Sequence, residues 1–276
     1  MKIKKLPSLF LLFFILSCTN RQNAEFSDTK DSSLAKIIVN NELVVGVDPS
    51  MPPLSFYAGT GKIIGYEVDI AQALADKLGV KLRLVPITSE DRIEQLEGRN
   101  IDYIASGFIN NDKNTERFLL STPYLRDALI VVVLENIAGA SSLTTLSDLR
   151  NKRIGLLADQ EIRDIVHQSV LNRNGSRQPY VYPRMEKLLI ALDYEEIEAA
   201  VTNLLTYYSQ ITKEKKNYRA IGEPLTITTY SYAFRKKDTA LHGAVEIFLN
   251  ELAQDGTLRA IGVKWFGADV SIVGKY

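Results

Sequence analysis

The sequence predicts an α/β fold in which mostly parallel sheets are flanked by helices. Short apolar segments with strand character alternate with amphipathic segments, first over residues 43–105 and again over residues 153–221. Such alternation is typical of parallel sheets covered by helices. The composition is that of a globular protein, with 46% hydrophobic and 24% charged residues in a chain of 276. A chain of this length is expected to form one or two domains.

The first series has the order β-α-β-α-β. Strands are predicted over residues 43–47, 81–85 and 101–105, and helices over residues 68–78 and 92–97. In the first helix Ile70, Leu74 and Leu78 share one apolar face, and Gly79 is a suitable C-cap. A sheet of this kind has its ligand crevice beyond the carboxyl ends of its strands.

A second series follows an apolar run over residues 128–134 and a small, polar stretch over residues 139–147, in which Ser147 is predicted to be an N-cap. Strands are predicted over residues 153–157, 180–182, 199–202 and 218–221, and helices over 161–171, 185–192 and directly after Asn203. The chain then closes with a long strand over 226–235 and helices over 241–255 and 258–265. The two halves therefore have similar wiring.

Charge and cysteine content exclude several classes of protein. Lys and Arg (33) balance Asp and Glu (33), whereas a nucleic-acid-binding domain carries a basic surface. One cysteine and two histidines form no cluster with metal-ligand spacing. No motif pairs a nucleophile with a base. We therefore expect no nucleic-acid partner, no metal, no cofactor and no catalytic residue.

The N-terminus is typical of a secretory signal peptide. Residues 1–5 carry three lysines, residues 6–16 are almost wholly apolar, and Ser17 precedes the only cysteine, Cys18. The apolar run is about half of the roughly 20 residues that a membrane-spanning helix needs. A small residue before the sole cysteine is similar to the bacterial lipobox, and this resemblance implies cleavage after residue 17 and lipidation of Cys18. Plain secretory cleavage, with Cys18 incidental, is the alternative.

Residues 18–36 are predicted to form a flexible, lipidated tether, because they are mostly polar and charged and have little to bury. The folded part would then be held to a membrane from the extracytoplasmic side, in the periplasm or at the cell surface.

Several short segments occur in a fixed order between residues 43 and 267. They are Leu43-Val44-Val45-Gly46-Val47-Asp48, Pro52-Pro53-Leu54-Ser55-Phe56, Gly61-Lys62-Ile63-Ile64-Gly65-Tyr66-Glu67-Val68-Asp69-Ile70, Ile101-Asp102-Tyr103, Ser121-Thr122-Pro123-Tyr124, Asp255-Gly256-Thr257-Leu258 and Lys264-Trp265-Phe266-Gly267. Together they resemble the polar amino-acid-binding (family 3) group of extracytoplasmic solute-binding proteins of ABC importers.

This resemblance implies a two-lobed, periplasmic-binding-protein-like fold of type II. Each lobe would be a mostly parallel sheet flanked by helices, and two hinge strands near residues 125–130 and 225–230 would join them. Lobe 1 would comprise residues 37–127 and 226–276, and lobe 2 residues 128–225. A monomer would capture a small polar solute by hinge closure and deliver it to a membrane permease.

The resemblance also assigns candidate ligand-binding residues. Asp48, Ser106 and Gly107 match the family's site positions, and Met51 and Ser89 fall where aromatic residues enclose the ligand side chain in some members. The family's carboxylate-binding arginine falls at Asn114 and its ammonium-binding aspartate at Asn203. The turn that holds the ligand carboxylate falls at Asp159-Gln160-Glu161.

Both charges that recognise a zwitterion are thus replaced by amides. Because an unpaired buried charge is costly, we predict a neutral or cationic solute, such as a modified amino acid, a small amide or peptide, or a polyamine-like cation. Asn114, Asn203, Asp48 and Glu161 would bind it. Arg117 is an alternative to the missing arginine, although a solvated charge at a helix end is the simpler interpretation.

Two other functions remain open at this point. In the first alternative, the cleft has decayed and the lipoprotein is a scaffold or sensor for a protein partner. In the second, the chain is a small-molecule dehydratase on the same fold. The second alternative would use Asp48 and Glu161 as an acid/base pair.

Overall fold

The structure is a computed structural model that describes residues 31–135, 143–171, 178–212 and 214–275. The predicted signal peptide and Cys18 therefore lie outside the described residues. Within the described part, no helix is both long enough and apolar enough to cross a membrane.

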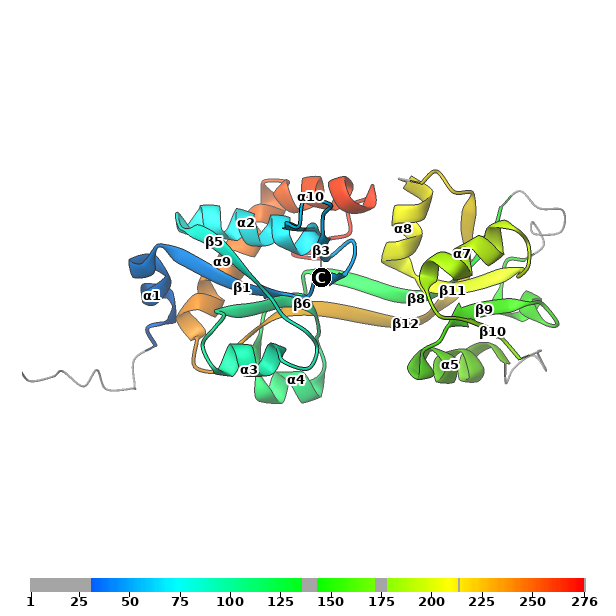
Figure 1. Ribbon diagram of the computed structural model, residues 1–276, viewed down its shortest axis with the longest axis horizontal. Helices are drawn as coiled ribbons and strands as arrows, with labels where there is room; N and C mark the ends of the chain where they lie inside the picture. Colours follow the sequence, from blue (N-terminus) through cyan, green and yellow to red (C-terminus); the bar gives the residue numbers. More distant parts are fainter. Residues whose placement is uncertain (1–30, 136–142, 172–177, 213, 276) are drawn as a thin grey trace, which may run out of the picture. The chain divides into compact units, whose positions relative to one another are not determined.

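Strands and helices alternate along the chain as predicted (Figure 1). The elements before the middle of the chain are α1 (Ser33–Asn40), β1 (Glu42–Val47), β2 (Ser50–Met51), β3 (Ser55–Tyr57), β4 (Ile63–Ile64), α2 (Tyr66–Leu78), β5 (Lys81–Pro86), α3 (Arg92–Glu97), β6 (Tyr103–Ile109), α4 (Asp112–Arg117), β7 (Leu119–Leu120) and β8 (Leu125–Leu134). The later elements are the 3-10 helix η2 (Leu146–Leu149), β9 (Ile154–Leu157), α5 (Gln160–Val166), the π-helical η3 (His167–Leu171), β10 (Tyr180–Tyr182), α7 (Met185–Asp193), β11 (Ala199–Asn203), α8 (Leu204–Thr212), β12 (Tyr218–Phe234), α9 (Thr239–Gln254) and α10 (Thr257–Phe266).

One nine-stranded sheet runs through the protein in the order β10-β9-β11-β8-β12-β6-β1-β5, with β7 paired to β12. β1 pairs in parallel with β5 and β6, and β9 pairs in parallel with β10 and β11. The pairs of β11 with β8 and of β6 with β12 are antiparallel. The result is two parallel sets of strands, as predicted, on either side of the central pair β8 and β12.

β8 and β12 lie side by side and join the two sets (Figure 1). Leu125 to Leu129 pair with Tyr230 to Thr226, and the register shifts between Ile221 and Thr226. The two segments predicted to cross between the lobes therefore pair with each other. The strands predicted separately over 218–221 and 226–235 are one interrupted strand, because β8 is long enough to pair with both.

Two local predictions differ from the structure. Thr145, not Ser147, is the N-cap of η2, because Thr145 and Asp148 form a capping box. α1 begins at Ser33, so residues 33–36 of the predicted tether are helical. The apolar side chain of Ile37 in this helix is 2% exposed, and its burial favours order over a flexible tether.

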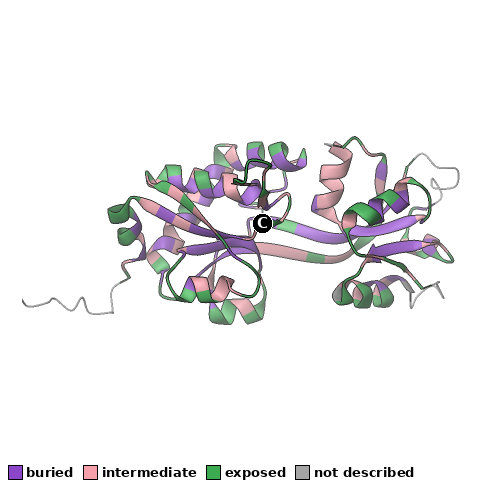
Figure 2. Cartoon of the chain, in the orientation of Figure 1, coloured by how far each residue is buried: buried purple, intermediate pink, exposed green. Residues whose placement is uncertain are grey.

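Buried residues lie along the strands and on the helices that cover them (Figure 2). α2, α9 and α10 pack over one face of the N-terminal strands, and Leu96 of α3 and Phe118 pack on the other. Trp265 and Phe266 anchor α10 in this core. α8 and α10 also touch, because Thr212 Oγ1 donates to the Phe266 carbonyl at 2.7 Å.

The carboxyl group of Glu67, at the start of α2, is fully buried in the core. Its Oε1 accepts hydrogen bonds from Gly107 N of β6, at 2.9 Å, and from the Tyr124 hydroxyl. Among the described residues, its Oε2 has no hydrogen-bond partner. Burial raises the pKa of Glu67 to about 7, against the lowering effect of both hydrogen bonds. This side chain connects α2, β6 and the segment that leads into β8.

Replacing Gly65 with alanine tests the tight entry into α2. Gly65 has φ +148°, and a Cβ there would lie 2.1 Å from the Leu54 carbonyl oxygen. We expect Gly65→Ala to destabilise the fold by about 2–4 kcal/mol in urea unfolding. Gly243→Ala in α9 is the matched control, since its Cβ would meet nothing within 4 Å, and should stabilise by about 0.5–1 kcal/mol. Equal effects of both substitutions would contradict this geometry.

Glu67 should make stability depend on pH. The folded state holds its proton more tightly than the unfolded state, so its stabilising contribution is complete below the ordinary pKa of 4.5 and is lost as the pH rises through about 7. Glu67→Gln keeps the acceptor oxygen but does not titrate. Between pH 4.5 and 7.5, we expect the wild type to lose a few kcal/mol of unfolding free energy relative to Glu67→Gln, at about 1.4 kcal/mol per pKa unit. Urea unfolding at both pH values measures this difference, and parallel pH profiles would refute it.

Candidate functional site

The carboxyl ends of β1 and β6 bring three predicted site residues together. Asp48 follows β1, and its backbone N donates to Ser106 Oγ of β6. The Asp48 carboxylate accepts hydrogen bonds from Ser50 N at 2.9 Å and from Ser50 Oγ at 2.6 Å. Asp48 therefore holds the turn after β1 in place with its side chain.

Gly107 lies next to Ser106, and its environment explains why it is glycine. Its φ is +51°, and a Cβ would lie 2.8 Å from Met51 Cε. The Gly107 amide donates to Glu67 in the core. The absence of a side chain at Gly107 thus lets Met51 pack against β6, while the amide itself is engaged by Glu67.

A second cluster forms where β8, β11 and β12 meet. Asp127 of β8 is 5% exposed, and its Oδ2 accepts a hydrogen bond from Asn203 Nδ2 at 3.1 Å. Its Oδ1 accepts from Ala128 N at 2.8 Å and from Leu205 N, at the start of α8, at 3.3 Å. Burial raises the pKa of Asp127, and these hydrogen bonds only partly offset that effect. Among the described residues, the groups that donate hydrogen bonds to this carboxylate are all neutral amides.

Two cavities meet at this cluster. The central cavity, of about 210 Å³, is lined by Ser50, Met51, Pro52, Pro53, Leu54, Asp127, Asn203, Leu205, Thr206 and Tyr230. The α5 cavity, of about 110 Å³, is lined by Asp127, Ala128, Leu129, Ile162, Ile165, Asn203, Thr226, Thr228 and Tyr230. Asp127, Asn203 and Tyr230 line both. The central cavity thus combines the turn after β1 with the start of α8.

A larger cavity of about 500 Å³ lies against α7 and α8 and shares Pro52, Pro53 and Thr206 with the central cavity. The two prolines form a shared wall between these cavities.

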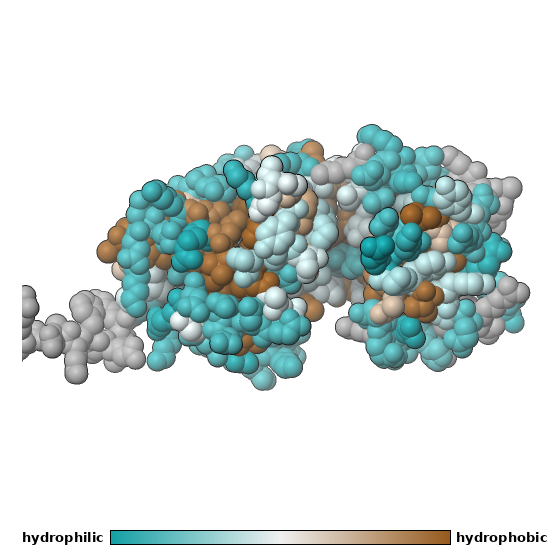
Figure 3. Space-filling model, viewed as in Figure 1, coloured by the Kyte–Doolittle hydropathy of each residue, from teal (hydrophilic) through white to brown (hydrophobic). Residues whose placement is uncertain are grey.

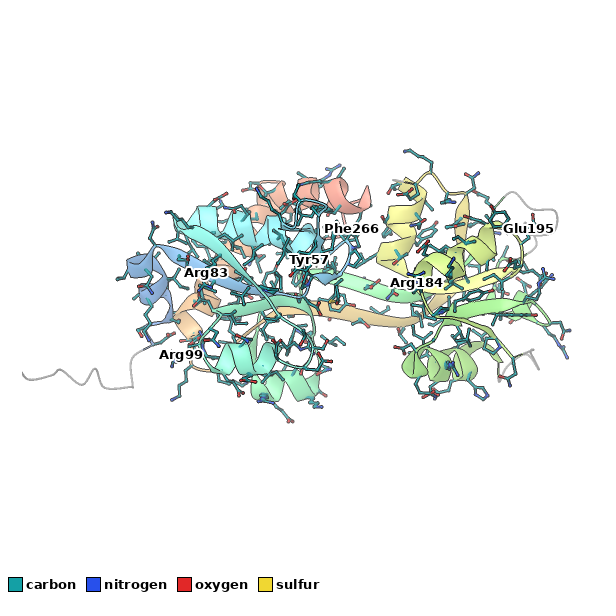
Figure 4. All side chains as sticks on the ribbon, viewed as in Figure 1. Tyr57, Arg83, Arg99, Arg184, Glu195 and Phe266 are labelled. Carbon is teal, nitrogen blue, oxygen red and sulfur yellow. The ribbon has the colours of Figure 1, made fainter. Side chains whose placement is uncertain are left out.

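Arg184 precedes α7 and Glu195 follows it (Figure 4). On the face drawn in Figure 3, hydrophilic side chains predominate over this half of the protein, and hydrophobic ones gather over the N-terminal elements.

The remaining predicted residues are engaged elsewhere. Ser89 is exposed, and the Asn114 side-chain amide donates to the Ile109 carbonyl at 2.8 Å. Gln160 Nε2 donates to Asp164 at 2.8 Å along α5, and the side chain of Glu161 lies outside the described part. Arg117 pairs with Glu97 at 2.7 Å, which agrees with its interpretation as a charge at a helix end. Of the predicted residues, Met51 and Asn203 thus line the central cavity.

Asp127 and Tyr230 were missed by the sequence analysis. Strand alternation offered a means of finding Asp127, because it shares a face with Leu125 and Leu129, which are both buried. A carboxylate on the apolar face of a strand is exceptional. Within the described residues, no cluster of His, Cys, Asp and Glu could hold a metal ion.

Comparisons with known proteins place this architecture. Residues 43–268 match the model of the bacterial extracellular solute-binding proteins, family 3. L-cystine-binding protein TcyJ of Escherichia coli K12 is 28% identical over 241 residues, which are 86% of this chain and 87% of TcyJ.

Solved structures give the same result. The crystal structure of Tv2483 bound to L-arginine superposes with a TM-score of 0.64 and 30% identity, covering 88% of this chain and 98% of that one. A polar amino acid ABC uptake transporter substrate-binding protein from Streptococcus thermophilus has a TM-score of 0.77 at 19% identity, covering 90% and 94%. The latter likeness shows the fold, a mixed α/β fold of the type II periplasmic-binding-protein class. With most of its length matched to the family model, the chain belongs to the bacterial extracellular solute-binding proteins, family 3.

Proposed function

We propose that this protein is the extracytoplasmic substrate-binding component of an ABC importer, and that it carries a small, amino-acid-like solute to a membrane permease. The central cavity is the observation that supports this most, because it joins residues of the turn after β1 to Asn203 and the start of α8. The names of the relatives, which bind L-cystine or L-arginine, support an amino-acid-like solute. As a family member the chain is a solute-binding protein, not an enzyme, so the dehydratase alternative is set aside.

Hinge closure about β8 and β12 is the proposed mode of capture. The proposed lobes, residues 37–127 with 226–276 and residues 128–225, meet where these two strands pair. A solute that contacts both lobes stabilises the arrangement in which both sets of contacts are made. The permease would then recognise that arrangement, with the binding protein acting as a monomer.

The proposed solute has a neutral or cationic group at the end where the ligands of the family have a carboxylate. Asn114 stands at the position that the resemblance gives to the arginine, and its amide is held by Ile109. Arg117 is paired with Glu97. Neither side chain offers a two-pronged cation directed at a carboxylate, the geometry that arginine supplies.

Lipidation of Cys18 is the proposed means of membrane attachment. The basic residues 1–5, the apolar run and the position of the sole cysteine support it. Residues between Cys18 and α1 would serve as the tether.

A thermal-shift screen of the purified protein tests the proposed function. The panel contains free amino acids, dipeptides, polyamines, small amides and sugars at millimolar concentration. A ligand at 100 times its Kd adds about 2.7 kcal/mol, which raises the Tm by roughly 5–10 °C for this size of protein. We expect such shifts with neutral or cationic amino-acid-like solutes. Shifts with ordinary free amino acids would contradict the proposed solute class, and shifts with sugars alone would contradict the proposed function.

Substituting Cys18 tests membrane attachment. We expect Cys18→Ala, expressed in a bacterial host, to leave the membrane fraction and to lose incorporation of labelled fatty acid, because a thiol is the proposed acylation site. The wild type processed in the same host is the control. Equal labelling and fractionation of the two proteins would contradict lipidation at Cys18.

A further inference from the structure

We propose that Asp127 is the residue that binds the cationic group of the solute, an ammonium or a guanidinium, in the central cavity. This inference rests on the proposed function and adds the identity of the charged contact. Neither the resemblance nor the ammonium-binding position at Asn203 points to residue 127, which lies on a different strand.

The surroundings of Asp127 compensate its negative charge only in part. A carboxylate that is 5% exposed normally has a cationic partner, because burying an isolated charge costs several kcal/mol. The hydrogen bonds that it accepts from described residues come from backbone amides and from Asn203, which stabilise the charge only partly. Burial accordingly raises the pKa of Asp127. A bound cation would supply the missing compensation.

Two cavities border Asp127. Asp127 lines both the central cavity and the α5 cavity, so a small molecule in either cavity would lie against this residue. Tyr230 lines the same two cavities, and burial, with the charges of Asp127 and Glu67, keeps the pKa of its hydroxyl well above the ordinary value. The neutral ring of Tyr230 is a suitable wall for an ammonium or guanidinium group.

The backbone hydrogen bonds that Asp127 accepts from Ala128 and Leu205 involve only one of its two carboxylate oxygens. Oδ1 accepts from Ala128 N and from Leu205 N at the start of α8, so it helps to cap that helix. The side-chain oxygen of an asparagine can accept the same two bonds. Oδ2 is contacted within the described residues by Asn203 Nδ2 at 3.1 Å, and a carboxylate oxygen can accept a further hydrogen bond. Capping therefore does not require the negative charge, whereas binding a cation does.

The test compares three variants in isothermal titration calorimetry with putrescine and agmatine, an ammonium and a guanidinium compound without a carboxylate, as cationic probes and L-glutamine as the amino-acid probe. Asp127→Asn keeps the cap acceptor and removes the charge. Asp148→Asn, which changes a carboxylate that accepts backbone hydrogen bonds from Thr144 and Thr145 of the η2 capping box, is the matched control. The double variant Asp127→Asn with Asn203→Asp moves the carboxylate to the neighbouring side chain across the 3.1 Å hydrogen bond.

We expect wild type and Asp148→Asn to bind a cationic probe alike and Asp127→Asn to bind it about 10- to 100-fold more weakly, the effect of losing a charged hydrogen bond. The double variant should recover most of that affinity. Unchanged binding by Asp127→Asn, or no binding of either cationic probe by the wild type, overturns the inference. Glutamine carries an α-ammonium as well, so equal affinity of the wild type and Asp127→Asn for glutamine overturns the inference too, but leaves the proposed function standing.

Circular dichroism and thermal melting establish whether each variant is folded. If Asp127→Asn does not fold, the wild type is titrated with putrescine while the side-chain carboxyl carbons are followed by NMR. The signal assigned to Asp127 should move with the same midpoint as the calorimetric titration. An unmoved Asp127 signal in a protein saturated with putrescine overturns the inference.

Discussion

Antiparallel pairing between β8 and β12 is the constraint on which the other parts of the structure depend. It merges two parallel sets of strands into one sheet, and both sets reach it through antiparallel neighbours, β6 on one side and β11 on the other. Cavities at the ends of parallel strands thereby come to lie beside the connecting strands. Residues 125–129 and 226–230 pair with each other, and Asp127 and Tyr230 from this pair line both the central cavity and the α5 cavity.

Two buried carboxyl groups near this pair, those of Glu67 and Asp127, have different surroundings. Glu67 is deep in the N-terminal core and accepts two hydrogen bonds, and its raised pKa of about 7 means that a proton can neutralise it near physiological pH. Asp127 lies beside cavities that a solute can enter. The two carboxyl groups therefore have distinct means of reducing the cost of burial. Glu67 takes up a proton, and Asp127, in our proposal, binds a cation.

The strands and most helices were predictable because their signals are local. The spacing of apolar residues and a C-cap such as Gly79 depend on a few neighbouring residues. These signals predicted the bounds of α2, β5 and α3 to within two residues. The site was less predictable because its contacts are between distant segments. The side-chain amide of Asn114 donates to the Ile109 carbonyl, and that of Gln160 donates to Asp164. Matching sequence positions to a family does not reveal these local hydrogen bonds. Asp127 lies within the predicted hinge strand, directly before the apolar run 128–134. Its contacts come from Asn203 of β11 and Leu205 of α8, which are distant in the sequence, so its neighbours in the chain do not predict its burial.

The position of Asp127 on the connecting strands has a mechanical consequence in the proposed hinge mechanism. A group close to an axis of rotation moves through a short arc, so its contacts change little in energy between open and closed arrangements. Because a ligand shifts a conformational equilibrium only through its differential affinity for the two states, a contact near the axis sets how tightly a cation is held. Contacts with a longer lever arm set how far the protein closes.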